Sequence, residues 1–227
     1  TDRVRGVCVT RDGAKIFSAS MDHTARCFDA ATGAELLRLP HDNLVWDVRL
    51  TPDEKHIVTA TNAAIRVWDA ASGTEVTTLK PHSEQICDIH VVDGQQVVSM
   101  HDTVIITSEL FPKQTFRRWQ DHRTAPVFSM CLSFDGERVI TAHSNRVPTV
   151  WHVASGALLH TLTGHTNTVM AVCMTADDRT IVTGSSDKTI RLWDAATGQQ
   201  TRVMEGHTDH VYSVDVSRDG ALLVSGS

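Results

Sequence analysis

The fold of this chain is decided by the stretch from Gly164 to Asp194, GHTNTVMAVCMTADDRTIVTGSSDKTIRLWD. It contains three short apolar segments, at 169–174, 180–183 and 189–193, and each is bounded by polar turn residues. Segments of this length are too short for stable helices and are typical of strands joined by tight turns. The stretch therefore predicts an antiparallel strand meander.

The same pattern recurs along the whole chain. Five histidines mark it, with successive steps of 41, 40, 43 and 42 residues: His41, His82, His122, His165 and His207. A second landmark keeps steps of 40, 40, 43 and 42 residues and is aromatic in four of five repeats: Phe28, Trp68, Ser108, Trp151 and Trp193. Because two independent landmarks share one period, the repeat covers all 227 residues.

Gly164-His165 and Trp193-Asp194 delimit one repeat, and on this motif the chain resembles the WD40-repeat family. The resemblance implies an all-β propeller whose blades are four-stranded antiparallel sheets, with strands a to d running outward. We expect one domain, 1–227, with repeats at 1–39, 40–79, 80–120, 121–163, 164–205 and 206–227. Five repeats of four strands and two strands of a sixth predict 22 strands.

About five and a half blades are thus present, whereas the resemblance implies a parent ring of about seven. We therefore expect the domain to be incomplete at both ends and its missing strands to come from the rest of a longer polypeptide. The third repeat departs furthest, since Ser108-Glu109 replaces Trp-Asp. In the fourth repeat Pro148 falls in the third strand, where we expect a bulge or an opened ladder.

The resemblance also implies a hydrogen-bonded tetrad inside a blade, complete in the fifth repeat alone: His165, Thr183, Asp187 and Trp193. In the family's pattern the indole N–H of Trp193 meets the Thr183 hydroxyl, the hydroxyl meets His165, and His165 meets Asp187. Asn62 is expected to weaken the network in the second repeat. Partial sets match in the others: Asp22 and Ser18 in the first, His82, Ser99 and Asp102 in the third, and His122, Thr141, Asn145 and Trp151 in the fourth.

A hydroxyl, a histidine and an aspartate also suggest a hydrolase. We expect the Thr183 hydroxyl to lie inside a blade, bound to the indole, with no cleft for a substrate and no oxyanion donors. A catalytic set would occur once, whereas pieces of this set recur in several repeats. The structural interpretation is therefore favoured.

Members of the family typically bind partners on the face built from the d–a and b–c loops. Five residues beyond the repeat histidine lies a position whose family counterparts often make contacts. The predicted partner-binding residues are Arg5, Trp46, Cys87, Phe128, Met170 and Tyr212. Trp46 is the strongest candidate, because every other Trp occupies a repeat position with a structural role. The alternative is that some of these side chains pack inward between blades.

Composition narrows the function classes. The net charge is -6 and no basic run exceeds Arg117-Arg118, so a nucleic-acid partner is not expected. No stretch approaches the ~20 apolar residues of a membrane span. Cys8, Cys131 and Cys173 are equivalent and expected to face the core, and neither CxxC nor HExxH occurs, so we expect no disulfide framework, metal or other cofactor. A cytoplasmic or nuclear location is predicted.

The sequence thus predicts a non-catalytic platform, a scaffold or adaptor, that binds a protein or peptide. Three alternatives remain open. A ligand-sensing propeller of a signalling nucleotide-binding protein would be distinguished by the sequence before Thr1. A propeller enzyme would need carboxylates or histidines that converge at the channel mouth, and a nucleic-acid reader would need a basic face larger than Arg3, Arg5 and Arg146 provide.

Overall fold

The computed structural model describes residues 2–62, 64–80, 86, 88–92, 96–101, 104–110, 116–120 and 125–227, without the side chains of 101 and 116–120. Within these ranges the regular structure consists of 22 β-strands, as the repeat count predicts. The chain divides into two compact units, unit 1 (1–120) and unit 2 (121–227). The predicted all-β fold class is confirmed.

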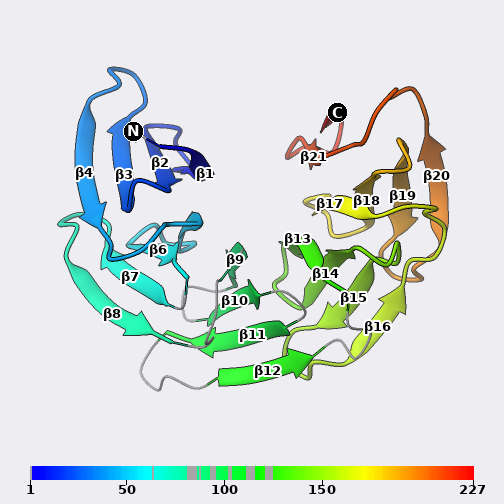
Figure 1. Cartoon of the computed structure of the whole chain (residues 1–227), viewed down its shortest axis with the longest axis horizontal. Helices are drawn as coiled ribbons and strands as arrows, with labels where there is room; N and C mark the ends of the chain where they lie inside the picture. Colours follow the sequence, from blue (N-terminus) through cyan, green and yellow to red (C-terminus); the bar gives the residue numbers. More distant parts are fainter. Residues whose placement is uncertain are drawn as a thin grey trace. The chain divides into compact units, whose positions relative to one another are not determined.

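Unit 1 contains three four-stranded antiparallel sheets, blades 1 to 3 (Figure 1). Strands that follow one another in the sequence are neighbours in each sheet, so the blades are simple meanders. The strands are β1 (Val4–Val9), β2 (Lys15–Ser20), β3 (Thr24–Asp29) and β4 (Glu35–Pro40) in blade 1; β5 (Asp47–Leu50), β6 (His56–Ala60), β7 (Ile65–Asp69) and β8 (Glu75–Leu79) in blade 2; β9 (Asp88–Val91), β10 (Gln96–His101), β11 (Val104–Glu109) and β12 (Phe116–Gln120) in blade 3.

Unit 2 contains blades 4 and 5, which are four-stranded, and blade 6, which has two strands. The strands are β13 (Val127–Leu132), β14 (Arg138–His143), β15 (Thr149–His152) and β16 (Leu158–Thr161) in blade 4; β17 (Val169–Met174), β18 (Thr180–Ser185), β19 (Ile190–Asp194) and β20 (Gln200–Met204) in blade 5; β21 (Ser213–Val216) and β22 (Leu223–Gly226) in blade 6.

Pro148 shortens a strand of blade 4. The strand β15 begins only at Thr149, and the Pro148 carbonyl accepts a hydrogen bond from the Leu162 N–H at 2.9 Å. The ladder to β14 accordingly ends at the pair Thr141–Thr149. Since proline has no N–H to donate, the ladder opens at this residue, which is one of the two outcomes expected from the sequence.

The outer strand of four blades carries a bulge opposite the aromatic residue of the repeat. The register between the third and fourth strands shifts at Phe28, Trp68, Trp151 and Trp193. Blade 3 has Ser108 at this position, and its ladder from β11 to β12 shows no shift. A bulge adds one residue and bends the strand, so the bend accompanies the large ring and is absent where a serine replaces it.

The apolar cores lie between adjacent blades. In unit 1 a cluster joins Leu39 of blade 1 to Trp68 of blade 2. In unit 2 the corresponding cluster joins Leu162, just after β16, to Trp193 of blade 5. Each of these tryptophans therefore packs against the end of the preceding blade's outer strand, while its indole N–H stays inside its own blade.

The turns from the first to the second strand of five blades share one pattern of side-chain hydrogen bonds. In blade 5 the Thr175 hydroxyl donates to Asp177 Oδ1 at 2.6 Å, and the same oxygen accepts the N–H of Arg179 at 3.1 Å. Such local side-chain bonds stabilise tight turns at the expense of extended structure. The same hydroxyl–carboxylate pair occurs at Thr10 and Asp12, Thr51 and Asp53, Ser133 and Asp135, and Ser217 and Asp219.

Two of these turns also bind the preceding blade. The Asp178 carboxylate accepts the backbone N–H groups of Phe134 and Asp135 at 2.6 and 2.8 Å. In unit 1 the Glu54 carboxylate accepts the N–H of Arg11 at 2.6 Å. Asp178 and Glu54 both have a φ of 58°, which a non-glycine residue adopts at some cost. The hydrogen bonds between blades compensate for that backbone conformation.

Candidate functional site

The structure brings together the four side chains of the tetrad in blade 5. Trp193 Nε1 donates to Thr183 Oγ1 at 2.9 Å, and Thr183 Oγ1 lies 2.7 Å from His165 Nε2. His165 Nδ1 lies 2.7 Å from Asp187 Oδ2. The chain of bonds thus runs from the outer part of the blade, at β19, through β18 to the loop before β17 and the turn after β18.

The protonation states of His165 and Asp187 fix which atom donates and which accepts in each hydrogen bond of this network. Burial lowers the pKa of His165, against the opposing effect of Asp187, so the imidazole is neutral near pH 7. Although burial opposes its ionisation, hydrogen bonds from Thr189, His165 and the N–H of Thr166 hold the pKa of Asp187 well below its usual range. Nδ1–H of His165 therefore donates to Asp187, and Nε2 accepts a hydrogen bond from the Thr183 hydroxyl. Each donor of the network thus has an acceptor.

Blade 2 contains the same arrangement without its acid. Trp68 Nε1 donates to Thr59 Oγ1 at 2.9 Å, and His41 Nε2 lies 2.8 Å from that oxygen. His41 Nδ1 lies 2.9 Å from the Leu39 carbonyl, which takes the place of a carboxylate. Burial lowers the pKa of His41 to about 4. The network is closed by a backbone oxygen.

In blade 4 a histidine that the sequence spacing did not indicate, His143, bonds to two threonines of the blade. His143 Nε2 lies 2.7 Å from Thr141 Oγ1 and 2.9 Å from Thr149 Oγ1, and Trp151 Nε1 donates to Thr149 at 2.8 Å. The side-chain oxygen of Asn145 accepts the N–H of Val147 at 3.1 Å, and the assignment of Asn145 to this network stays a prediction. His122 lies outside the described residues. The signal that could have identified His143 is its place in β14, two residues beyond Thr141 on the same face.

The remaining blades contain fragments of the network. Asp22 in blade 1 accepts hydrogen bonds from the Thr24 hydroxyl at 2.6 Å and pairs with Arg26 at 2.6 Å. In blade 6 His207 Nε2 lies 2.7 Å from Ser225 Oγ, a pair that the sequence reasoning missed although the repeat spacing contained it. In blade 3 Ser99 Oγ donates to the Ile106 carbonyl at 3.3 Å, while His82 and Asp102 lie outside the described residues.

The predicted partner-binding residues occupy equivalent backbone positions at the start of the innermost strand. The register between the first two strands of blades 1, 4 and 5 skips Arg5, Phe128 and Met170, so each is the extra residue of a β-bulge. Trp46 and Tyr212 directly precede β5 and β21, and their N–H groups bond to Ala60 and Gly226 across the blade. Cys87 lies outside the described residues. The sequence spacing identified this position without predicting the bulge.

Exposure differs among these side chains. Tyr212 is 59% exposed and Phe128 49% exposed, which is unusual for large aromatic residues. Arg5 is also exposed, and Met170 is half-buried. In unit 2 the strands that carry Phe128, Met170 and Tyr212 pack side by side in sequence order, β13 on β17 and β17 on β21. Three large side chains therefore follow one another along neighbouring blades.

Trp46 has intramolecular contacts, contrary to the expectation that it has no structural role. It is half-buried, its Nε1–H donates to Asn62 Oδ1 at 2.8 Å, and the Arg5 guanidinium carbon lies 5.0 Å from its ring centroid. Asn62 thus binds Trp46, and no bond from it to the histidine of blade 2 is present among the described contacts. The indole is held in a defined orientation, with one edge bonded and one face next to a cation.

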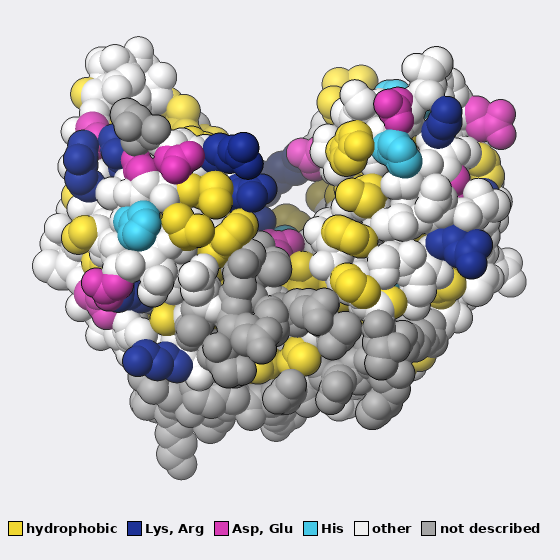
Figure 2. Space-filling view, in the orientation of Figure 1, with side chains coloured by type: hydrophobic (Ala, Val, Ile, Leu, Met, Phe, Trp, Pro, Cys, Tyr) yellow, Lys and Arg dark blue, Asp and Glu magenta, His cyan; other side chains and the backbone are white. Residues whose placement is uncertain are grey.

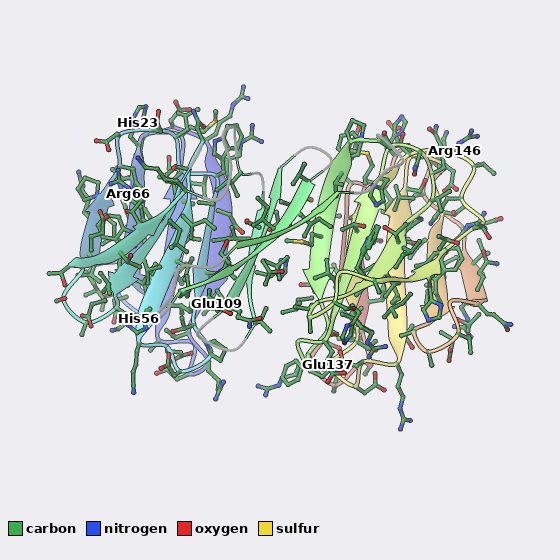
Figure 3. All side chains as sticks on the ribbon, turned by 90° about the horizontal axis from the view of Figure 1, so that it is seen from below. His23, His56, Arg66, Glu109, Glu137 and Arg146 are labelled. Atoms are coloured by element: carbon green, nitrogen blue, oxygen red, sulfur yellow. The ribbon has the colours of Figure 1, made fainter. Side chains whose placement is uncertain are left out.

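The two ends of each unit are distinguished by their turns. In unit 1, Figure 3 places His23 and Arg66 at one end of the strands and His56 and Glu109 at the other. In unit 2 it places Arg146 at one end and Glu137 at the other. His23 and Arg146 belong to b–c turns. On the face of unit 1 in Figure 2, Lys and Arg side chains lie beside hydrophobic ones.

A comparison with protein families matches the WD domain, G-beta repeat (WD40), at residues 1–29, 34–69, 156–194 and 198–227. These matches cover more than half of the chain. The chain belongs to the WD40 family. The unmatched residues 70–155 include the parts of blades 3 and 4 in which Ser108-Glu109 and Trp151-His152 replace Trp-Asp.

Several curated WD40 relatives are similar to this chain. Autophagy-related protein 16 of Arabidopsis thaliana is 26% identical over 162 residues, or 66% of this chain and 30% of the relative. U3 small nucleolar RNA-associated protein 15 homolog of Gallus gallus is 27% identical over 67% of this chain and 30% of the relative. Cell division cycle 20.1, cofactor of APC complex, of Arabidopsis thaliana is 25% identical over 61% of this chain and 31% of the relative. The chain thus spans about 30% of the length of these relatives.

In this WD40 chain the Thr183 hydroxyl is poorly placed for nucleophilic attack. Thr183 is fully buried, and its oxygen is bonded to the indole and to the imidazole. A nucleophile needs an approach path for its substrate and donors for the developing oxyanion. The buried bonds suit a structural role in the blade.

Two features are absent from the part of the chain that the structure describes. It contains no helix long and apolar enough to cross a membrane. It also contains no group of three or more His, Cys, Asp or Glu side chains placed to hold a metal ion. Of the free cysteines, Cys8 and Cys173 are half-buried, and burial raises the pKa of each thiol to about 12.

Proposed function

We propose that this chain is a non-catalytic platform that binds a protein or peptide through the blade ends where the d–a loops enter the inner strands. A cytoplasmic or nuclear setting fits this proposal. The support from comparison is general: the family is built from repeats, and the relatives include a protein named as a cofactor of a complex. The support from geometry is specific to this chain.

The observation that carries the proposal is the repeated position at the start of the inner strand, which is a β-bulge in blades 1, 4 and 5. A bulge turns its extra residue out of the ladder and re-aims the side chain. Phe128 and Tyr212 are exposed there although burial of a large aromatic side chain would be favourable by ~2 to 3 kcal/mol. Aromatic residues, Met and Arg are the types enriched at interface hot spots, and this position holds Arg5, Trp46, Phe128, Met170 and Tyr212.

The proposal is tested by two truncations with a matched control. Phe128→Ala and Tyr212→Ala should each weaken partner capture by about 30-fold or more, since hot-spot truncations cost ~2 kcal/mol or more. Phe134→Ala is the control, because Phe134 is 72% exposed and belongs to the turn after β13, at the opposite end of the same strand from Phe128. All three variants should keep the wild-type melting temperature within a few degrees.

A photo-crosslinking residue at position 212 should join a partner, and the same residue at position 134 should not. The captured protein then serves in quantitative binding assays with the purified variants. Equal binding by wild type, Phe128→Ala and Tyr212→Ala would mean that the contact surface does not lie at the blade ends where the d–a loops enter the inner strands. Loss of binding by Phe134→Ala alone would place it at the opposite end of the strands.

A further inference from the structure

A polar cavity of about 340 Å³ lies in unit 1, next to the proposed binding position. Its lining includes Arg5 of β1, Trp46, Asp47 and Arg49 of blade 2, and Asp88 of β9. Three adjacent inner strands thus contribute to one hollow. Its volume is at the lower end of the ~300 to 1,000 Å³ of small-ligand sites, so it is large enough for a single side chain of a partner.

Two carboxylates at this cavity share one guanidinium. Arg49 Nη2 lies 3.1 Å from Asp47 Oδ2 and 3.4 Å from Asp88 Oδ1, while Arg49 Nε donates to the Ile89 carbonyl at 3.1 Å. Asp47 is buried, at 5% exposure. When both carboxyls are ionised, the single guanidinium of Arg49 offsets only one of them. The cluster of Asp47, Arg49 and Asp88 then has an excess of one negative charge. A further cation in the cavity would be stabilised by that charge.

The neighbouring ring of Trp46 is already in contact with a guanidinium, that of Arg5. The Arg5 guanidinium carbon lies 5.0 Å from the Trp46 ring centroid, within the range of a cation–π contact. The bond from Trp46 Nε1 to Asn62 keeps that ring in place. Arg5 is exposed and extends from a bulge at the start of β1, so another planar cation can displace it at little cost.

We propose that this cavity binds the side chain of an arginine presented by the protein partner, with its guanidinium against Trp46 and toward the Asp47–Asp88 pair. Arg5 then acts as an internal stand-in for the partner's arginine: its guanidinium lies over the Trp46 ring when no partner is bound. A guanidinium suits the site better than an ammonium, because it is planar, weakly hydrated, and able to stack on a ring while donating to carboxylates. The inference rests on the proposed function and specifies the chemistry of its partner.

Gly6 also lines this cavity and allows β1 to pack closely against Asp47. A Cβ atom at this residue would meet Asp47 Oδ1, and the next nearest atoms belong to the backbone of Asp47 and Val48. The strand β1 can therefore approach the Asp47 carboxylate closely only because residue 6 has no side chain. This close approach brings Arg5, one residue earlier, to the cavity.

The test uses the whole chain and two small probes, N-acetyl-arginine methylamide and N-acetyl-citrulline methylamide, titrated by NMR. The two have nearly the same shape and differ by one charge and by an NH2 group of arginine that is an oxygen in citrulline, so a pocket selective for shape alone would accept both. We expect saturable binding of the arginine probe and at least roughly tenfold weaker binding of the citrulline probe, equivalent to ~1.4 kcal/mol. Equal binding of the two, or no saturable binding of arginine at millimolar concentration, would overturn the proposal.

Variants locate the probe. Asp47→Asn and Trp46→Ala should each reduce arginine binding at least roughly tenfold, whereas Asp42→Asn should not, because Asp42 is an exposed aspartate that pairs with Arg66. Arg5→Ala should strengthen arginine binding, since it removes the internal competitor. A weaker affinity for arginine in Arg5→Ala would contradict the stand-in role. The probe comparison on the unmodified chain gives a result even if a variant fails to fold.

The pH dependence gives an independent readout. Asp47 is faced by Arg49 on its own strand, by Asp88 and His90 on β9, and by Cys8 on β1. Burial raises the pKa of both Asp47 and Asp88. A bound guanidinium favours their ionised forms, so binding of the arginine probe releases protons. Affinity for the arginine probe should therefore rise between about pH 5 and about pH 8.

Failure of this inference and failure of the proposed function are distinguishable. If arginine does not bind but Tyr212→Ala still loses its partner, the platform function stands and the cavity has another role. If arginine binds with the expected selectivity while Phe128→Ala and Tyr212→Ala capture partners normally, the arginine site stands and the contact surface in unit 2 is wrong.

Discussion

Replacement of Thr183 by valine tests whether the buried network stabilises blade 5. Valine has nearly the same shape as threonine, so the substitution removes the hydroxyl and leaves little empty space. The hydroxyl accepts from Trp193 Nε1 at 2.9 Å and donates to His165 Nε2 at 2.7 Å, and both partners are buried. Each of the two orphaned polar groups costs ~1 to 3 kcal/mol, so the free energy of unfolding should fall by ~2 to 6 kcal/mol.

The assay is urea denaturation followed by tryptophan fluorescence, and the control is Thr201→Val. Thr201 is an exposed threonine of β20 whose hydroxyl donates to the Leu192 carbonyl, and in the variant water can replace the hydroxyl as the donor. The control should change the free energy of unfolding by no more than about 0.5 kcal/mol. A Thr183→Val variant as stable as the control would refute the account of the network.

A double-mutant cycle isolates the bond between Thr183 and Trp193. Trp193→Phe removes the indole N–H, so the valine no longer leaves that donor without an acceptor. The double variant should therefore cost less than the sum of the two single variants, by roughly 1 kcal/mol. Strict additivity would mean that the 2.9 Å contact contributes nothing to stability.

Two further predictions concern pH and the turns. Because the pKa of His41 falls from 6.5 to about 4 on folding, the unfolded chain binds the proton first as the pH drops. The free energy of unfolding should decrease by up to ~3 kcal/mol between pH 6.5 and pH 4, and a His41→Gln variant should show a flatter profile; identical slopes would contradict this. Asp178→Ala should lower stability by ~1 kcal/mol and speed amide exchange at Phe134 and Asp135, with Glu137→Ala as the silent control; unchanged exchange at both amides would contradict their hydrogen bonds to the Asp178 carboxylate.

Local sequence signals predicted most of the architecture. Strand number and turn positions follow from short-range alternation and from a repeat period that two landmarks share, and the tetrad of blade 5 follows from the resemblance to the WD40 family. The recurrence also identified the position of Arg5, Trp46, Phe128, Met170 and Tyr212 before any strand was placed. These features depend on residues within one repeat, where spacing along the chain determines spacing in the blade.

The contacts that the sequence did not predict depend on register and on the approach of neighbouring blades. His143 joins Thr149 because β14 and β15 pair with Thr141 opposite Thr149, a contact that the repeat spacing did not indicate. Trp46 binds Asn62 through a turn shape that the residue types do not specify.

By itself, then, the sequence determined the fold family, the strand order and the repeated positions that could carry function, since each is encoded within about 40 residues. Tertiary structure alone decided which polar side chains meet across blades. Asp47 and Arg49 come from the second repeat and Asp88 from the third, and the three form one cluster because β5 packs on β9, while Gly6 lets β1 approach Asp47. Inter-strand packing of this kind depends on side-chain volumes in several repeats at once, which no single repeat contains.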